Sequence, residues 1–202
     1  MNKNRWHTVL ISSVCASAFL AGCSIFQPVK QPDNYILAIP VMQVEKTIPA
    51  NVVVQAVDGR AQYLRRSITV NPQPYRLTTY PDHQWAASPC EMALECMISY
   101  LGSTCDYVAP SRLQALQEAG WIVITYIDVF DQVKRDNRWY ADCRIRYEIV
   151  SAKSNQSAGA WIYERSAALP SGKVEDYVAA QNASFEGFLK ELTSRLNGIA
   201  KS

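Results

Sequence analysis

Apolar and polar residues alternate most clearly over Trp139–Val150. Residues 139, 141, 143, 145, 147 and 149 are apolar, and the residues between them are mostly polar or charged. A period of two with one apolar face predicts a β-strand that is buried on one side. Trp121–Phe130 and Ala160–Ala167 are also strand-like. With Asp131–Arg138 and Ser151–Gly159 as turns, we expect the three strands to form an antiparallel meander.

Two other segments have apolar residues at three- and four-residue steps, which is typical of an amphipathic helix. The longer, Val174–Ile199, needs a surface on which to pack its apolar stripe, and the predicted sheet is the obvious partner. The shorter begins at Ser88-Pro89-Cys90-Glu91, where an N-cap serine, a proline and a glutamate make a capping box. We expect this helix to end near Gly102.

The first half of the chain contains shorter strand-like segments. Asn51–Val57 is almost continuously apolar, which predicts a central strand buried on both faces. Tyr35–Ile39 is expected to be a first strand. Ser67–Val70 and Tyr75–Tyr80 are expected to be short edge strands joined by Asn71-Pro72-Gln73-Pro74. The whole pattern predicts a single α+β domain in which a mixed, largely antiparallel sheet packs against two main helices.

The first 22 residues differ from the rest. Lys3 and Arg5 precede Thr8–Leu20, an apolar run of 13 residues that is too short to cross a hydrocarbon core of about 30 Å. This is the length of a signal-peptide core, and Leu20-Ala21-Gly22-Cys23 has the order of a bacterial lipobox. We therefore expect residues 1–22 to be a lipoprotein signal peptide, Cys23 to be lipidated, residues 23–33 to be a tether and residues 34–202 to be the domain. The alternative is an ordinary signal peptide that is cut near Gly22.

Charge narrows the choice of partners. The chain has 20 basic and 18 acidic residues, and two of the basic residues lie in the leader, so the mature chain has 18 of each. A neutral domain gives no electrostatic reason to expect nucleic acid as a partner. No later segment approaches the ~20 apolar residues of a membrane span.

Four cysteines would remain in the mature chain: Cys90, Cys96, Cys105 and Cys143. In an oxidising periplasm they permit three pairings. Cys90 and Cys96 would lie about 9 Å apart on one helix, beyond the reach of a disulfide, and a Cys90–Cys105 bridge would need the chain to double back sharply. Cys96–Cys105 with Cys90–Cys143 is then the least strained choice. Four buried free thiols are an equal alternative.

A search for catalytic chemistry finds little. His83 is the single histidine of the mature chain and cannot make a multi-histidine zinc site. The cysteines lack C-x-x-C spacing, and no glycine-rich loop follows a strand. Asp82-His83 as part of a catalytic triad is a weak hypothesis. We therefore predict no enzyme activity, no metal and no cofactor.

Some residues suit contact with a partner better than catalysis. Tyrosine, tryptophan and arginine dominate interface hot spots, and the segment around residues 60–85 is rich in them, including Arg60 and Tyr75. The candidate contact residues are Tyr63, Arg65, Arg66, Tyr80 and Trp85. The alternative is that the aromatic residues simply pack in the core or on edge strands.

Three short motifs give the sequence a family resemblance. Tyr35-Ile36-Leu37 resembles an early Y-x-L strand, Tyr63-Leu64-Arg65-Arg66 a Y-L-x-R connector, and Trp85-Ala86-Ala87-Ser88-Pro89 a Trp-Ala-x-x-Pro entry to a helix. With the lipobox, the meander and the last helix, this pattern resembles the ABC-type transport auxiliary lipoproteins, the PqiC-like group.

The resemblance implies a non-enzymatic lipoprotein in the outer membrane that faces the periplasm. It would dock with an MCE-type partner of an inner-membrane ABC transporter that moves lipids between the membranes. Ser24, which follows the expected lipidation site, is consistent with sorting to the outer membrane. Family members can form rings, so a homo-oligomer is a reasonable expectation. The alternative is a structural or assembly lipoprotein of another envelope machine, such as a secretion pore or a pilus.

Overall fold

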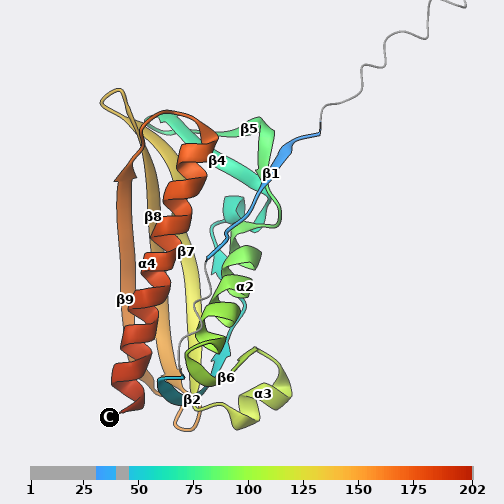
Figure 1. Cartoon of the computed structure of the whole chain (residues 1–202), viewed down its shortest axis with the longest axis vertical. Coiled ribbons are helices and arrows are strands. Elements are labelled where there is room, and N and C mark those ends of the chain that lie inside the picture. The colour runs from blue at the N-terminus through green and yellow to red at the C-terminus, as the bar shows by residue number, and fades with distance from the viewer. Residues whose placement is uncertain (1–30, 40–45, 202) are drawn as a thin grey trace, which may run out of the picture. The chain divides into compact units, whose positions relative to one another are not determined.

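The computed structural model describes residues 31–39 and 46–201 (Figure 1). The predicted signal peptide, Cys23 and most of the predicted tether lie outside these residues. The strands of the described part are β1 (Asp33–Tyr35), β2 (Ile48–Val54), β3 (Asp58–Gly59), β4 (Ser67–Gln73), β5 (Arg76–Trp85), β6 (Cys105–Pro110), β7 (Trp121–Arg135), β8 (Arg138–Ser151) and β9 (Ser157–Ala168). The helices are η2 (Ala61–Leu64, a 3₁₀ helix), α2 (Pro89–Gly102), α3 (Leu113–Glu118) and α4 (Val174–Ala200).

The long strand β7 is the centre of one mixed sheet. Strand β8 pairs antiparallel with β7 from end to end, and β9 continues the antiparallel meander beside β8. On its other side, β7 pairs in parallel with β2, β3 and β4 along successive segments. Strand β6 extends the sheet beyond β2, while β5 and β1 extend it beyond β4. The predicted mixed sheet and its meander are confirmed, and the longest pairings are antiparallel.

Helices α2 and α4 lie side by side on one face of this sheet (Figure 1). The apolar stripe of α4 is buried as predicted, with Tyr177, Phe185, Phe188, Leu192 and Leu196 fully covered. These residues share one hydrophobic core with the sheet and α2, which confirms a single α+β domain. No helix within residues 31–39 and 46–201 is long and apolar enough to cross a membrane.

The predicted start of α2 is confirmed. The Ser88 hydroxyl accepts a hydrogen bond from the Glu91 amide at 3.2 Å, and the Glu91 carboxylate accepts one from the Ser88 amide at 2.9 Å. Pro89 is the first helical residue, and the helix ends at Gly102 as expected. This reciprocal cap satisfies two backbone donors that the first helical turn would otherwise leave unpaired.

The predicted turn at Asp131–Arg138 is wrong, because β7 and β8 both continue into it. The turn itself is only Asp136-Asn137, and both residues have positive φ angles of 46° and 60°. Two residues of positive φ are typical of the tight hairpin turn whose twist matches the flanking strands. Polar composition suggested a loop here, whereas the polar side chains belong to paired strands.

Two further predictions about strands need correction. The prediction that β4 is an edge strand is wrong, because β4 lies between β5 and β7. Its proline, Pro72, is tolerated within the irregular register between Val70 and Gln73. The turn that follows is at Pro74-Tyr75, three residues later than the start of the predicted link. The first strand is Asp33–Tyr35 and not Tyr35–Ile39.

Candidate functional site

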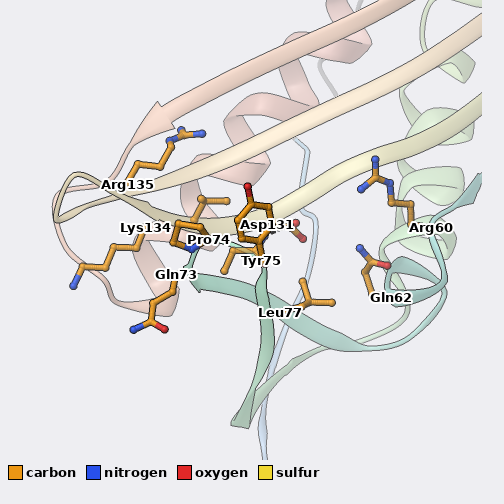
Figure 2. Close-up of a pocket in the computed structure, with 11 residues that line it drawn as sticks. Arg60, Gln62, Gln73, Pro74, Tyr75, Leu77, Asp131, Lys134 and Arg135 are labelled. Atoms are coloured by element: carbon orange, nitrogen blue, oxygen red, sulfur yellow. Dashed lines mark hydrogen bonds between the residues drawn. The ribbon is translucent and has the colours of Figure 1, made fainter.

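The face of the sheet opposite to α2 and α4 carries a groove at the end of β7. Successive side chains of a strand point to opposite faces. The ring of Phe130 packs on the helix-covered face against Trp85, whose ring also contacts that of Tyr177. The alternate residues Asp131 and Val133 line the groove on the other face (Figure 2).

The groove has a volume of about 580 Å³ and is formed by four elements. The end of β7 forms its floor, the β4–β5 hairpin forms one wall, and η2 with the residue before it forms the other (Figure 2). The lining residues are Arg60, Gln62, Asn71, Gln73, Pro74, Tyr75, Leu77, Asp131, Val133, Lys134 and Arg135.

The floor of the groove holds a nearly buried carboxylate. Asp131 is only 6% exposed, and it accepts hydrogen bonds from the Tyr63 hydroxyl at 2.8 Å and from the Asn71 amide at 2.9 Å. Burial raises the pKa of Asp131, while these two donors and the charge of Arg60 partly oppose the increase. The carboxylate therefore links η2, β4 and β7 below the groove.

A second polar network fixes the hairpin from the other face. The Tyr80 hydroxyl donates to Oε1 of Gln132 at 2.6 Å, and Nε2 of Gln132 donates to the carbonyl of Gly172 at 3.1 Å. The Tyr177 hydroxyl donates to the carbonyl of Phe130 at 2.9 Å. Strands β5 and β7 and the start of α4 are thereby joined by paired polar groups.

The rim of the groove is apolar and basic. Tyr75 is fully exposed and Leu77 is 54% exposed, and Figure 2 shows both on the hairpin beside the floor. Arg135 forms a salt bridge with Asp142 at 2.7 Å. Arg60 and Lys134 form no salt bridge within the described part of the chain, and Lys134 lies 5.6 Å from the centre of the Trp139 ring. The arrangement suits recognition of an acidic group beside an apolar one.

The predicted contact residues are only partly on the surface. Tyr63 and Trp85 are each 1% exposed and belong to the core, so the prediction that they contact a partner is corrected: their rings fill space beneath the sheet. Tyr80 is half-buried in the network described above. Arg65 and Arg66 are exposed, but Arg66 is engaged with the Trp85 carbonyl and with Asn34.

The sequence counts Tyr75 among the residue types that suit contact but not among the candidate contact residues, and it does not single out Leu77. Aromatic type alone does not distinguish Tyr75 from Tyr63, because both cores and interfaces use tyrosine. The available signal was the sequence Pro74-Tyr75, since proline followed by a second turn residue marks the exposed tip of a hairpin.

His83 fastens β1 to β5. Its Nδ1 lies 3.3 Å from the Tyr35 hydroxyl and 3.5 Å from the Asp33 carboxylate, and its ring contacts those of Tyr35 and Tyr80. Among the described contacts of His83 there is none to Asp82, the other half of the hypothetical triad. Within residues 31–39 and 46–201, no three histidine, cysteine or acidic side chains are placed to hold a metal ion.

Cys90, Cys96, Cys105 and Cys143 are free thiols in this structure. Cys90, Cys105 and Cys143 are buried, and Cys96 is half-buried with its Sγ 3.6 Å from the Leu37 carbonyl. Burial raises the pKa of the Cys90 and Cys143 thiols to about 12. Thiols with such a high pKa are almost entirely protonated at neutral pH and hence unreactive as nucleophiles.

No protein-family model matches the sequence, and no curated protein matches it. The fold, in contrast, is similar to known structures. A Xanthomonas campestris protein of family DUF330 has a TM-score of 0.70 and 13% identity, and the match covers 81% of this chain and 95% of that one. An uncharacterised protein has a TM-score of 0.64 and 9% identity, with 81% and 97% covered.

A more distant likeness is to a lipoprotein from Neisseria meningitidis, with a TM-score of 0.36 and 9% identity over 76% of this chain and all of that one. A score this low carries no argument about the present chain. The two closer matches show a shared fold: the chain has the α+β architecture of the DUF330 protein from Xanthomonas.

Proposed function

We propose that this chain is a non-enzymatic lipoprotein subunit of an ABC/MCE-type system for lipid transport between membranes. In this proposal Cys23 carries the lipid that anchors the chain in the outer membrane, and the domain faces the periplasm. The domain acts as a docking module that receives an MCE-type partner protein of the inner-membrane transporter.

The observation that carries the proposal is the meeting of the three family-like motifs at one junction. Tyr35 pairs with Trp85 in the β1–β5 register, and the Ala86 amide donates to the Tyr35 carbonyl at 2.7 Å. The Arg66 carbonyl accepts from the Trp85 amide at 2.7 Å, while its guanidinium donates to the Trp85 carbonyl at 3.0 Å. Chance matches far apart in a sequence have no reason to meet, so this contact supports a shared folding pattern.

The chemistry of the groove also favours contact over catalysis. Its lining offers an aromatic tip, an aliphatic side chain and cations, which are the usual components of protein interfaces. Asp131 is the acidic residue of the lining, and its hydrogen-bond partners are Tyr63, which is only 1% exposed and out of reach of a substrate, and the amide of Asn71, which is not a nucleophile. A docking role uses these features without requiring a reaction.

Crosslinking in intact cells tests the proposal. The full-length chain is crosslinked through its surface amines and purified from membranes, and the attached proteins are identified by mass spectrometry. We expect an MCE-domain protein together with ABC transporter subunits. Recovery of a secretin or a pilus component, or of the lipoprotein alone, would overturn the proposal. A Cys23→Ser variant, which cannot be lipidated, is expected to leave the membrane fraction and lose the partner.

A further inference from the structure

The tip of the β4–β5 hairpin carries a tyrosine in an unfavourable backbone conformation. Tyr75 has a φ angle of 62°. Pro74 followed by a residue of positive φ is the arrangement of a type II turn, whose second central position favours glycine. A side chain in the left-handed region is disfavoured because its Cβ comes too close to the following carbonyl oxygen, and such strain concentrates at functional sites.

No contact within the described part of the chain stabilises the Tyr75 side chain in this conformation. Its side chain is fully exposed, and no hydrogen bond, ring contact or cation–π contact joins it to another residue of the described chain. Leu77 on the same wall of the groove is 54% exposed. The hairpin thus holds two large apolar side chains in water, at the edge of a groove of about 580 Å³.

Charge identifies the kind of partner that fits. On the open face, Arg135, which also lines the groove, and Arg144 and Arg146 are each paired with a carboxylate. Arg60 and Lys134, at the rim of the groove, form no salt bridge with any described residue. The groove's own carboxylate, Asp131, lies buried below them and is already hydrogen-bonded. Since no carboxylate of residues 31–39 and 46–201 forms a salt bridge with either cation, the surface is complementary to an acidic partner.

A peptide segment suits this surface better than a membrane does. The walls of the groove are polar as well as apolar, since they carry the side-chain amides of Gln62 and Gln73. Covering such groups with acyl chains would leave polar atoms without water or a hydrogen-bonding partner, which is unfavourable. A peptide supplies backbone amides and side chains that can pair with them.

We infer that the surface formed by Arg60, Tyr75, Leu77 and Lys134 is where the partner protein docks, through a segment that presents carboxylates beside an apolar side chain. This inference rests on the proposed docking function and names the surface that performs it. The Tyr75 ring and Leu77 bind the apolar side chain, and the two cations bind the carboxylates.

Site-specific photo-crosslinking of the full-length lipoprotein in cells tests the inference. The photoreactive amino acid p-benzoylphenylalanine replaces Tyr75, and in a matched control it replaces Tyr107, an aromatic residue of β6 that is 49% exposed. We expect position 75, and not position 107, to crosslink to a protein segment in which acidic residues outnumber basic ones. A crosslink to lipid, to a second copy of this chain or to a segment without excess acid would overturn the inference, as would equal yields at both positions or none.

Two sets of substitutions test the charges at the rim and the backbone strain at Tyr75 separately. Arg60→Glu with Lys134→Glu is expected to lower the crosslink yield from position 75 about tenfold or more, whereas Arg112→Glu with Lys153→Glu, two exposed cations outside the groove, leaves it unchanged. Tyr75→Gly removes the φ strain, so its melting temperature should equal or exceed that of the wild type while partner recovery falls. Loss of stability together with binding would show a structural role and overturn the inference.

These outcomes distinguish failure of the proposed docking surface from failure of the proposed transport function. If amine crosslinking recovers an MCE-type partner but position 75 does not touch it, the proposed function stands and the docking surface is wrong. If position 75 contacts an acidic segment of a protein from another envelope machine, the surface stands and the proposed transport role is wrong.

Discussion

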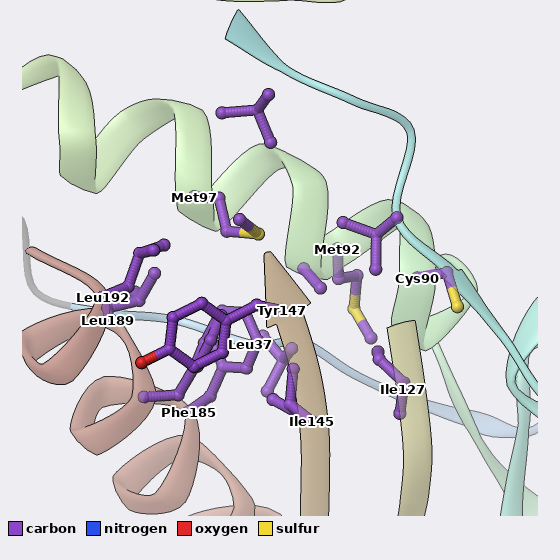
Figure 3. Close-up of a cluster of buried hydrophobic side chains, with 14 of the residues drawn as sticks. Leu37, Cys90, Met92, Met97, Ile127, Ile145, Tyr147, Phe185, Leu189 and Leu192 are labelled. Carbon is purple, nitrogen blue, oxygen red and sulfur yellow. The ribbon is translucent and has the colours of Figure 1, made fainter. Parts of the chain in front are cut away.

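The two faces of strands β7, β8 and β9 come from alternating residues of the same segments, yet different forces hold them. On the covered face, Ile145 and Tyr147 lie toward Phe185 and other apolar residues of α4, and Ile127 lies beside Met92 of α2 (Figure 3). On the open face, arginines pair with carboxylates across neighbouring strands. One face is fully removed from water, and the other remains in it.

The covered face supplies most of the stability of this domain, whereas the open face contributes little to stability. Burial of apolar area stabilises the fold by about 25 cal/mol per Å². This stabilisation depends on the area removed from water and not on the orientation of one group relative to another. Exposed ion pairs gain little because water and salt screen them. The open face therefore has freedom to vary, and the groove and the exposed hairpin tip lie there.

The largest expected effect is on the covered face. Phe188 is fully buried, and its ring centre lies 5.3 to 6.0 Å from those of Phe185, Tyr147 and Tyr163. Phe188→Ala should lower the free energy of unfolding by about 3–5 kcal/mol, since it removes apolar area and leaves a cavity. Chemical unfolding followed by circular dichroism measures this loss. Ile162→Ala, at a 59% exposed position of β9, is the control and should cost less than about 1 kcal/mol. Similar losses at the two positions would refute the contrast.

Asp131 is expected to be the exception on the open face, because it is buried there. Its pKa is raised, so the folded state holds the proton more strongly than the unfolded state does. The contribution of this carboxyl to stability is therefore lost progressively as the pH rises from its ordinary pKa of 3.8 through the raised value. Unfolding measured between acid and neutral pH should show this decline in the wild type. Asp131→Asn should lack it, and parallel pH profiles for the two proteins would contradict the expectation.

A smaller loss is expected at the start of α2, on the covered face. Ser88→Ala removes the hydroxyl that caps the Glu91 amide and should cost about 1 kcal/mol in the free energy of unfolding. The matched control is Ser194→Ala, an exposed position within α4, where alanine is a good helix former and no loss is expected. If both variants unfold alike in denaturant, the capping box does not contribute to stability.

Local patterns predicted the elements that bury one face. The alternation in Trp139–Val150 and the three- and four-residue spacing in Val174–Ile199 correspond closely to β8 and α4, because periodicity records which side of an element meets the core. The parallel pairing of β2, β3 and β4 with successive parts of β7 could not be predicted in this way. It joins segments far apart in the sequence, and nothing local in those segments records their partners.

The candidate site was harder to predict than the fold. Tyr63, Trp85 and Tyr75 are all aromatic, and only burial separates the first two from the third. Burial at the hairpin depends on whether the turn falls at Asn71–Pro74 or at Pro74-Tyr75, which a shift of a few residues decides. The sequence predicts a turn at Asp131 for the same reason, since its polar neighbours resemble a loop when strand pairing is unknown.

The smallest effect is expected from the ion pairs of the open face. Arg144 and Glu164 lie 2.6 Å apart, but their side chains are 44% and 59% exposed, so solvent screens their attraction. Arg144→Ala should leave the melting temperature at physiological salt within the error of calorimetry, and Arg144→Ala with Glu164→Ala should do the same. A clear loss in the single variant, absent from the double variant, would show that the pair neutralises a charge the fold cannot tolerate alone. The unpaired state of Arg60 and Lys134 would then require its own structural explanation, and charge on this face could no longer be interpreted as recognition.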